Sequence, residues 1–218
     1  MADTVVITAI DVDPSEPGLR LVMAGTRLLG RVQRQLIETT SIRVGDVVDD
    51  ATRFLLDEAH RLTELRLKAI RSLSRAPASS ARLAERLVRG GGDPDDVGTV
   101  LGALAEEGIL DDLDTARRTA ADALRSGPVG RRRLTAVLRK RGFEATVTEH
   151  ALEEVLATRD AHRDVQEATQ RCARDLQSLP RDTAARRLAG RLARRGFADE
   201  DVSDAVEAWL AEHDQPPK

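Results

Sequence analysis

The sequence has little aromatic character and almost no cysteine. Aromatic residues make up 2% of the 218 residues, and tyrosine is absent, so a core must be built mainly from leucine, valine and alanine. Such a core suits closely packed helices better than a β-sandwich. The single cysteine, Cys172, excludes an intrachain disulfide and a zinc site made of several cysteines.

Long apolar runs are also missing. No stretch reaches the roughly 20 apolar residues of a membrane-spanning helix. The opening segment MADTVVITAIDVDP lacks the basic-then-apolar order of a signal peptide. We therefore expect a cytoplasmic protein that makes no contact with a membrane.

No pattern predicts catalysis, a cofactor or a metal site. The glycine-rich segment VRGGGDP at 88–94 lacks the Gly-Lys-Ser/Thr of a nucleotide-binding loop, and it indicates a break between two helices. The histidines are isolated from one another and from any helical metal-ligand spacing; they are His60, His150, His162 and His213. We expect a non-enzymatic protein with no catalytic residues, no cofactor and no metal.

Residues 1–49 predict a small β-rich unit. The β-branched run TVVITAI at 4–10 is typical of a strand, and the runs LRLVMAG and TRLLGRV form two more around a turn at Gly25. We expect a three-stranded antiparallel sheet. A sheet of this size needs further packing to be stable, so it should lie against the next segment.

From residue 50 the pattern becomes helical, and it repeats. The segment RRLTAVLRKRGFEATVTEHALEEVL at 132–156 returns 54 residues later as RRLAGRLARRGFADEDVSDAVEAWL at 186–210. A weaker copy lies 51 residues before the first. Repetition at this spacing is typical of stacked helical repeats, in which neighbouring copies share a core.

Each copy has the same order of signals. A helix with leucines at i and i+4 ends at a glycine, which favours the left-handed conformation of a helix C-terminus. A second helix follows an expected cap: Asp93 before Pro94, a capping box of Thr146 and Glu149, or Asp199. With one helix upstream of each pair, we predict three three-helix repeats at 50–110, 111–158 and 159–218. The fold class is therefore mainly α, an elongated curved array of tandem repeats with a small N-terminal antiparallel β unit.

The segment LAEEGILDDLDTARRTAADALRSGPVGRRRLTAVLRKRGF at 104–143 resembles the central signature of the RecX family of regulators of the bacterial recombinase RecA. The resemblance rests on four features: the apolar-Asp-Asp step ending at Asp112, the alanine-rich helix after it, the turn from Gly130 to Leu134, and the Arg-x-x-Gly ending at Gly142. One departure is Thr115 before Ala116, where the family has an aromatic residue. The resemblance covers roughly residues 50–210.

The resemblance implies a non-enzymatic regulator that acts in recombination, DNA repair and the SOS response. It implies binding to the RecA–DNA filament, which would limit ATP hydrolysis, strand exchange and stimulated repressor cleavage. The expected partners are the RecA nucleoprotein filament and the DNA phosphate backbone, bound by a monomer. Alternatives are a DNA-binding helical repeat module without sequence specificity, and a generic helical adaptor.

The charge distribution points to a contact surface. Residues 123–197 contain 17 Lys and Arg against 9 Asp and Glu, a net charge of +8 in a chain whose total is −3. Several cations recur at equivalent positions, as Arg82, Arg133 and Arg187 do. We predict that the partner is bound by eight of them: Arg132, Arg133, Lys140, Arg141, Arg186, Arg187, Arg194 and Arg195.

A purely structural interpretation covers part of this pattern. Cations in the last turn of a helix complement its dipole, which accounts for Lys140 and Arg194. It does not account for Arg132, Arg133, Arg186 and Arg187, which lie near expected helix starts. Because the few aromatic residues occupy core positions, a nucleic acid would be held through phosphate contacts and not read by base.

Overall fold

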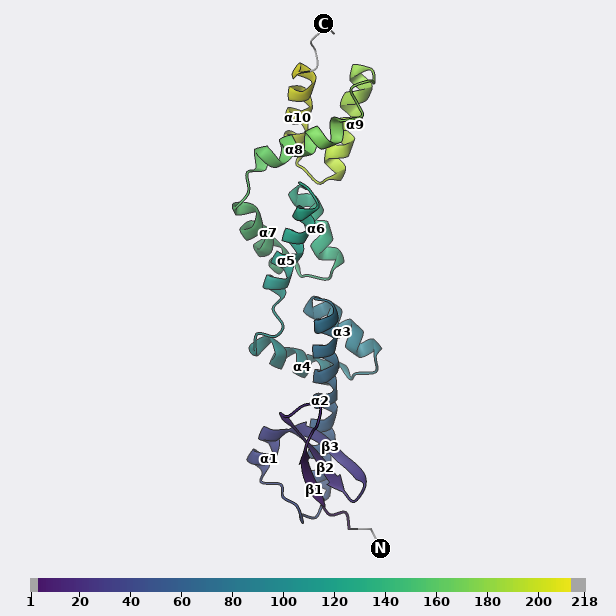
Figure 1. The fold of residues 1–218 in the computed structure, drawn as a ribbon, viewed down its shortest axis with the longest axis vertical. Helices are drawn as coiled ribbons and strands as arrows, with labels where there is room; N and C mark the ends of the chain where they lie inside the picture. Colours follow the sequence, from purple (N-terminus) through teal and green to yellow (C-terminus); the bar gives the residue numbers. More distant parts are fainter. Residues whose placement is uncertain (1–3, 213–218) are drawn as a thin grey trace. The chain divides into compact units, whose positions relative to one another are not determined.

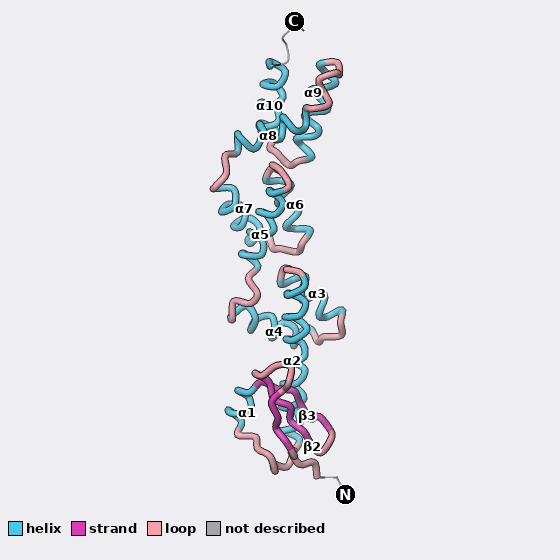
Figure 2. Tube along the Cα trace, in the orientation of Figure 1, coloured by secondary structure: helices cyan, strands magenta, loops and turns pink. Residues whose placement is uncertain are grey.

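The structure is a computed structural model, and it describes residues 4–212. The described residues form three strands and ten helices (Figures 1 and 2). The N-terminal elements are β1 (Ala9–Val12), β2 (Leu19–Ala24), β3 (Arg27–Gln33) and α1 (Arg34–Thr40). The longer helical part comprises α2 (Asp50–Arg75), α3 (Ser80–Arg89), α4 (Pro94–Glu106), α5 (Asp112–Arg125), α6 (Arg131–Lys140), α7 (Ala145–Ala157), α8 (Ala161–Ala173), α9 (Arg181–Arg194) and α10 (Asp199–Glu212).

The predicted antiparallel sheet is confirmed, with strand order β1-β2-β3. Its second hairpin turns at Gly25, which has a φ of 60°, a value that glycine adopts readily. The sheet packs on α2 through a core that includes Val22, Val32 and Leu56. A Cβ at Gly30 would lie 3.2 Å from the carbonyl oxygen of Leu56, so β3 lies close to the helix backbone.

One detail of the N-terminal prediction was wrong, and one helix was not predicted. The first strand begins at Ala9 and not at residue 4, because residues 5–7 pair instead with the loop at 45–48, where the Ile7 N–H donates to the Asp46 carbonyl at 2.9 Å. The segment at 34–40 has no signal that predicted a helix, and it forms α1.

The nine helices from α2 onward form three groups of three, each with a separate core. The first group, α2–α4, buries Leu83 and Leu104. The second group, α5–α7, buries Leu134 and Leu152, and the third group, α8–α10, buries Leu188. The predicted mainly helical fold with repeated three-helix groups is therefore confirmed.

The helix ends agree with the sequence in most places. Asp93 caps α4, and Pro94 is the first helical residue, as predicted. The prediction of a capping box at Thr146 and Glu149 was wrong. Helix α7 already begins at Ala145 after Glu144, so Thr146 lies inside the helix. Asp199 likewise lies within the first turn of α10 and does not precede it.

The two repeated glycines end helices as predicted. Gly142 follows α6 and Gly196 follows α9, with φ values of 83° and 84°, in the left-handed region that closes helices. The aromatic residues after them, Phe143 and Phe197, are each 5% exposed, and Trp209 is 7% exposed. These side chains therefore belong to the cores of the second and third groups, which confirms their predicted burial. For Phe54 of α2 the expected core position was wrong, since this residue is 67% exposed.

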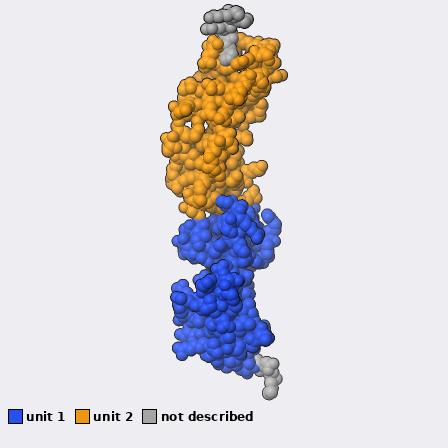
Figure 3. Space-filling view, viewed as in Figure 1, with its two compact units in different colours: residues 1–77, 83–110 blue, residues 78–82, 111–218 orange. Residues whose placement is uncertain are grey.

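The chain forms two compact units (Figure 3). One contains the described residues up to Pro77 together with Leu83–Leu110. The other contains Ala78–Arg82 together with the described residues from Asp111 onward. The second unit thus holds both complete groups α5–α7 and α8–α10, along with the short segment at the start of α3.

Candidate functional site: the basic ends of α6 and α9

The predicted contact residues lie at the two ends of α6 and in the middle and at the C-terminal end of α9, inside the second unit. The expectation that Arg186 and Arg187 lie near a helix start was wrong, because α9 already begins at Arg181 and both residues lie more than one turn inside it. Helix α6 begins after Gly130, which offers no side-chain cap. Its C-terminus and that of α9 each carry a basic last turn, which complements the negative end of the helix dipole. The same sequence pattern therefore places similar cations at similar positions of two helices.

The start of α6 meets the end of α9 backbone to backbone. The Gly130 N–H donates to the Arg195 carbonyl at 2.9 Å, and the Arg132 N–H donates to the Gly196 carbonyl at 3.2 Å. A Cβ at Gly130 would overlap that Gly196 carbonyl. The first N–H groups of one helix thus satisfy the last carbonyls of another, groups that each helix leaves unpaired on its own. We call this contact the joint.

Side chains add to the joint. The Arg132 guanidinium makes two hydrogen bonds to the Asp199 carboxylate, at 2.8 and 3.1 Å. Arg133 Nη1 lies 3.5 Å from the Arg194 carbonyl, and Arg195 Nη1 donates to the Pro128 carbonyl at 3.2 Å. The pKa of Asp199 is held below its usual value, mainly by the hydrogen bonds from Arg132. A cavity of about 510 Å³ flanks this contact.

The second unit contains the same contact once more, between residues 78–82 and the end of α6. The Ser79 hydroxyl donates to the Arg141 carbonyl at 2.9 Å, and Arg82 Nη2 donates to the Lys140 carbonyl at 3.0 Å. Arg82 occupies the position that Arg133 occupies in the sequence repeat, and the Ser79 hydroxyl takes the place of the Gly130 N–H. The joint is therefore a repeated structural element.

The structure separates the predicted contact residues into two sets. Six of them take part in joints through a side chain or a backbone group: Arg132, Arg133, Lys140, Arg141, Arg194 and Arg195. Lys140 and Arg194 supply joint carbonyls. The Arg186 side chain donates only to the Asp182 carbonyl of its own helix, at 3.3 Å, and the Arg187 side chain makes no hydrogen bond or ion pair within residues 4–212.

Sequence reasoning missed three residues that build the joints. Gly130 and Ser79 provide the donors at equivalent positions, and Asp199 provides the carboxylate. A serine or glycine three residues before Arg82 and Arg133, where the third copy has Ala184 before Arg187, was the available signal. The pairing of Arg132 with Asp199 spans 67 residues, and no local pattern indicates it.

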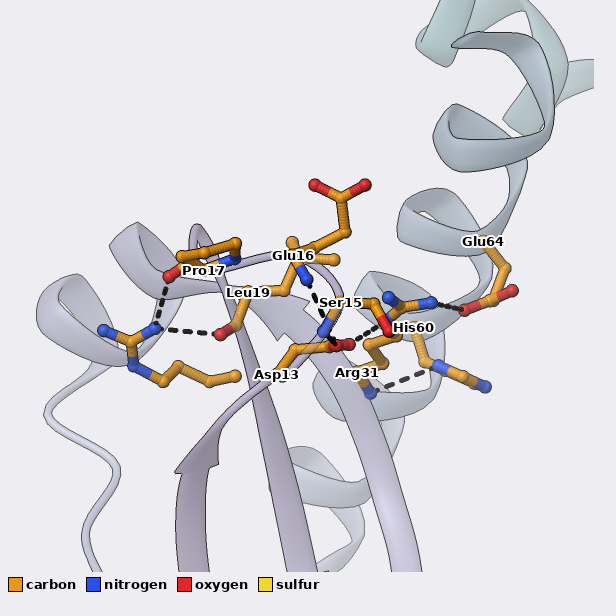
Figure 4. Close-up of polar contacts among 9 residues, drawn as sticks. Asp13, Ser15, Glu16, Pro17, Leu19, Arg31, His60 and Glu64 are labelled. Carbon is orange, nitrogen blue, oxygen red and sulfur yellow. Dashed lines mark hydrogen bonds and ion pairs between the residues drawn. The ribbon is translucent and has the colours of Figure 1, made fainter. Parts of the chain in front are cut away.

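A second polar cluster lies in the first unit (Figure 4). Arg31 on β3 reaches the Asp13 carboxylate on one side and Glu64 of α2, at 3.2 Å, on the other. The Arg31 N–H also donates to His60 Nδ1 at 3.2 Å. Burial acts to raise the pKa of Asp13, but the Ser15 N–H and the Arg31 guanidinium outweigh it, and the pKa is lowered. These contacts fasten the sheet to α2.

The structure offers no sign of a metal centre in the part of the chain it describes, where no three His, Cys, Asp or Glu side chains are arranged to hold an ion. His213 lies outside the described residues. No helix between residues 4 and 212 is long and apolar enough to cross a membrane.

The fold and the joints define a class, the tandem helical-repeat proteins with an N-terminal sheet. No family model matches the chain. The chain is 35% identical to the regulatory protein RecX of Mycolicibacterium vanbaalenii, covering 71% of this chain and 84% of the relative. It is 37% identical to the RecX of Chromohalobacter salexigens, covering 65% and 90%. At these levels of identity and coverage, the chain belongs to the RecX family of regulatory proteins, as its central segment predicted.

Solved structures agree on the fold. A crystal structure of a regulatory protein RecX matches with a TM-score of 0.75 at 14% identity, over 94% of this chain and 99% of the other. RecX from Lactobacillus salivarius matches with a TM-score of 0.60 at 13% identity, over 70% and 97%. Because these identities are low, the match concerns the fold. The family is one of regulatory proteins and not of enzymes, which confirms the prediction of a non-enzymatic chain.

Proposed function

We propose that this protein binds the RecA nucleoprotein filament and lowers its ATP hydrolysis, strand exchange and coprotease activity. The observation that carries the proposal is membership of the RecX family at 35% identity over most of a relative's length. Tandem helical groups present repeated surfaces, and a filament presents repeated protomers. Several weak contacts to neighbouring protomers then combine into a strong interaction.

We place the contact surface on the basic face of α6 and α9. Its members are the predicted residues Arg132, Arg133, Lys140, Arg141, Arg186, Arg187, Arg194 and Arg195. The charges of Arg186 and Arg187 are the best candidates, since neither side chain forms an ion pair within the described residues. Arg132 would have to leave Asp199 in order to bind a partner.

RecA ATP hydrolysis on single-stranded DNA tests the proposal. We expect the wild-type protein to inhibit hydrolysis, and Arg186→Glu with Arg187→Glu to weaken that inhibition at least tenfold in the concentration required. Arg118→Glu with Arg125→Glu is the matched control, because it reverses two exposed arginines on α5. Absence of inhibition by the wild type would refute the function, whereas equal inhibition by both double variants would refute the site.

The alternative of a DNA-binding module needs a helix that reads bases. The helix after each joint is poorly suited to this, since the first turn of α10 holds Asp199, Glu200 and Asp201, which phosphates would repel. Parallel binding measurements with the RecA filament and with bare duplex DNA separate the two functions. We expect tighter binding to the filament, and no sequence preference on the duplex.

A further inference from the structure

One face of helix α9 carries a hollow. The hollow has a volume of about 680 Å³ and is lined by Thr183, Arg186, Arg187, Gly190, Arg191 and Arg194. These positions are spaced by three or four residues, so they share one face of the helix. No hydrophobic side chain lines the hollow, and four guanidinium groups surround the glycine.

Gly190 has no structural reason to be a glycine. It lies in the middle of α9 without a positive φ, where glycine destabilises a helix by about 1 kcal/mol relative to alanine. A Cβ there would meet only the end of the Arg194 side chain, at 3.4 Å. The joint glycines differ, because a Cβ at Gly130 would overlap backbone atoms. The missing side chain at Gly190 leaves the hollow open instead.

The charges around the hollow are mostly uncompensated. Arg191 pairs with Asp175, its Nη2 donating at 2.8 Å. Hydrogen bonds from Arg191 lower the pKa of Asp175, and the charge of Arg187 adds to this effect. Arg186, Arg187 and Arg194 have no carboxylate within ion-pair distance among residues 4–212. A negative group entering the hollow would therefore meet three cations without having to displace a carboxylate from them.

We propose that the hollow around Gly190 binds phosphate groups of a nucleic-acid backbone. Guanidinium groups form paired, charge-assisted hydrogen bonds with phosphate oxygens. A compact tetrahedral anion needs no apolar lining, whereas a protein surface is usually anchored by buried aromatic or aliphatic side chains, and the hollow has no lining for them. This assignment rests on the proposed function, because the DNA of the RecA filament is then the molecule that supplies the phosphates.

Fluorescence anisotropy with a labelled oligothymidylate tests the assignment on the full chain. Replacing Arg186 and Arg187 by alanine should weaken binding about tenfold or more. It should also reduce the salt dependence, since each phosphate contact on a single strand adds about 0.7 to the slope of log affinity against log salt concentration. Replacing Arg118 and Arg125 by alanine removes the same charge from α5 and should leave binding nearly unchanged.

Two further variants separate binding from folding. Gly190→Gln fills the hollow with a better helix former, so the melting temperature should rise while affinity falls severalfold. Asp175→Asn removes the neighbouring carboxylate and should raise affinity about two- to fivefold. A loss of binding together with a gain in thermal stability excludes unfolding as its cause.

The outcomes distinguish this site from the proposed function. Unchanged oligothymidylate binding by the arginine double variant, or by Gly190→Gln, would overturn the phosphate site. If these variants bind the oligonucleotide normally but no longer inhibit RecA ATP hydrolysis, the hollow contacts the recombinase protein, and the phosphate assignment is again wrong. If the wild type does not affect RecA while the binding pattern holds, the proposed function fails and the phosphate site stands.

Discussion

Helices α6 and α9 have closely similar sequences but opposite surroundings at their starts. The Gly130 N–H before α6 donates to the end of α9. The equivalent residue of the third group, Ala184, donates to the Pro180 carbonyl within an added turn of α9. The same repeated segment therefore links two helical groups in one copy and begins with an added turn of its own helix in the next.

This difference explains the arginines that the sequence placed near helix starts, where the dipole alone would make them unfavourable; Arg132 and Arg133 do lie at the start of α6, whereas Arg187 lies inside α9. At α6, Arg133 approaches the carbonyl of Arg194 and Arg132 binds Asp199, so both meet negative groups from the third helical group. At α9, Arg187 has no such group apart from the field of Asp175. A recurring residue type thus serves a joint at one position and leaves a charge available to a partner at the other.

The cores of the second and third groups should lose similar stability when an equivalent aromatic side chain is truncated, even though the starts of α6 and α9 differ. Phe143 and Phe197 are equivalent and equally buried, so truncation of either to alanine should lower the free energy of unfolding by about 3–5 kcal/mol. Denaturant titration of both variants checks this. A change below about 1 kcal/mol for one of them alone would mean that the second and third groups do not share one core design.

Replacing Gly130 and Gly190 by alanine should change the stability in opposite directions. Gly130→Ala forces a Cβ onto the Gly196 carbonyl, so we expect a loss of about 2–3 kcal/mol, as for overpacked sites. Gly190→Ala should gain about 0.5–1 kcal/mol from helix propensity. Thermal unfolding of both variants measures the difference.

The Gly130 result also separates the joint from the cores. Loss of the joint should leave Trp209 buried, so its fluorescence emission should remain unshifted in the folded variant. A red-shifted emission in Gly130→Ala would show that the third core depends on the joint, contrary to the separate clusters.

At the joint formed by residues 78–82, substitution of a single residue should cost less stability than Gly130→Ala does at the other joint. Ser79 is fully buried and its hydroxyl donates to the Arg141 carbonyl, so Ser79→Ala leaves that carbonyl without its hydroxyl donor. We expect a loss of about 1–2 kcal/mol. The exposed Ser74, which bonds only within α2, is the control, and Ser74→Ala should change stability by less than about 0.5 kcal/mol. Equal effects of the two substitutions would contradict a role for Ser79 in the joint.

The sequence predicted what depends on local pattern. The leucine spacing predicted the helices, and Gly142 and Gly196 predicted their ends, because these signals act within one or two turns. Whether an arginine is paired within the protein depends on partners far along the chain, such as Asp199 for Arg132. The sequence pattern therefore could not predict it. The same reason applies to the late start of β1, since residues 5–7 are paired by the distant loop at 45–48.

The smallest expected effect concerns the edge of the α9 hollow. Hydrogen bonds from Arg191 lower the pKa of Asp175 to about 2, below the usual range of an aspartate. A carboxylate with a depressed folded pKa stabilises the protein above its unfolded pKa, and this contribution is lost as the pH falls through the folded value. Stability that depends on Asp175 should therefore decline between about pH 4 and pH 2.

Asp175→Asn removes this group, so the wild type and the variant should differ in unfolding free energy at pH 6 and converge at pH 2. Because the carboxylate is largely exposed, the difference should be small and should shrink in high salt. A gap that stays constant down to pH 2 would show that Asp175 acts through packing and not through its charge.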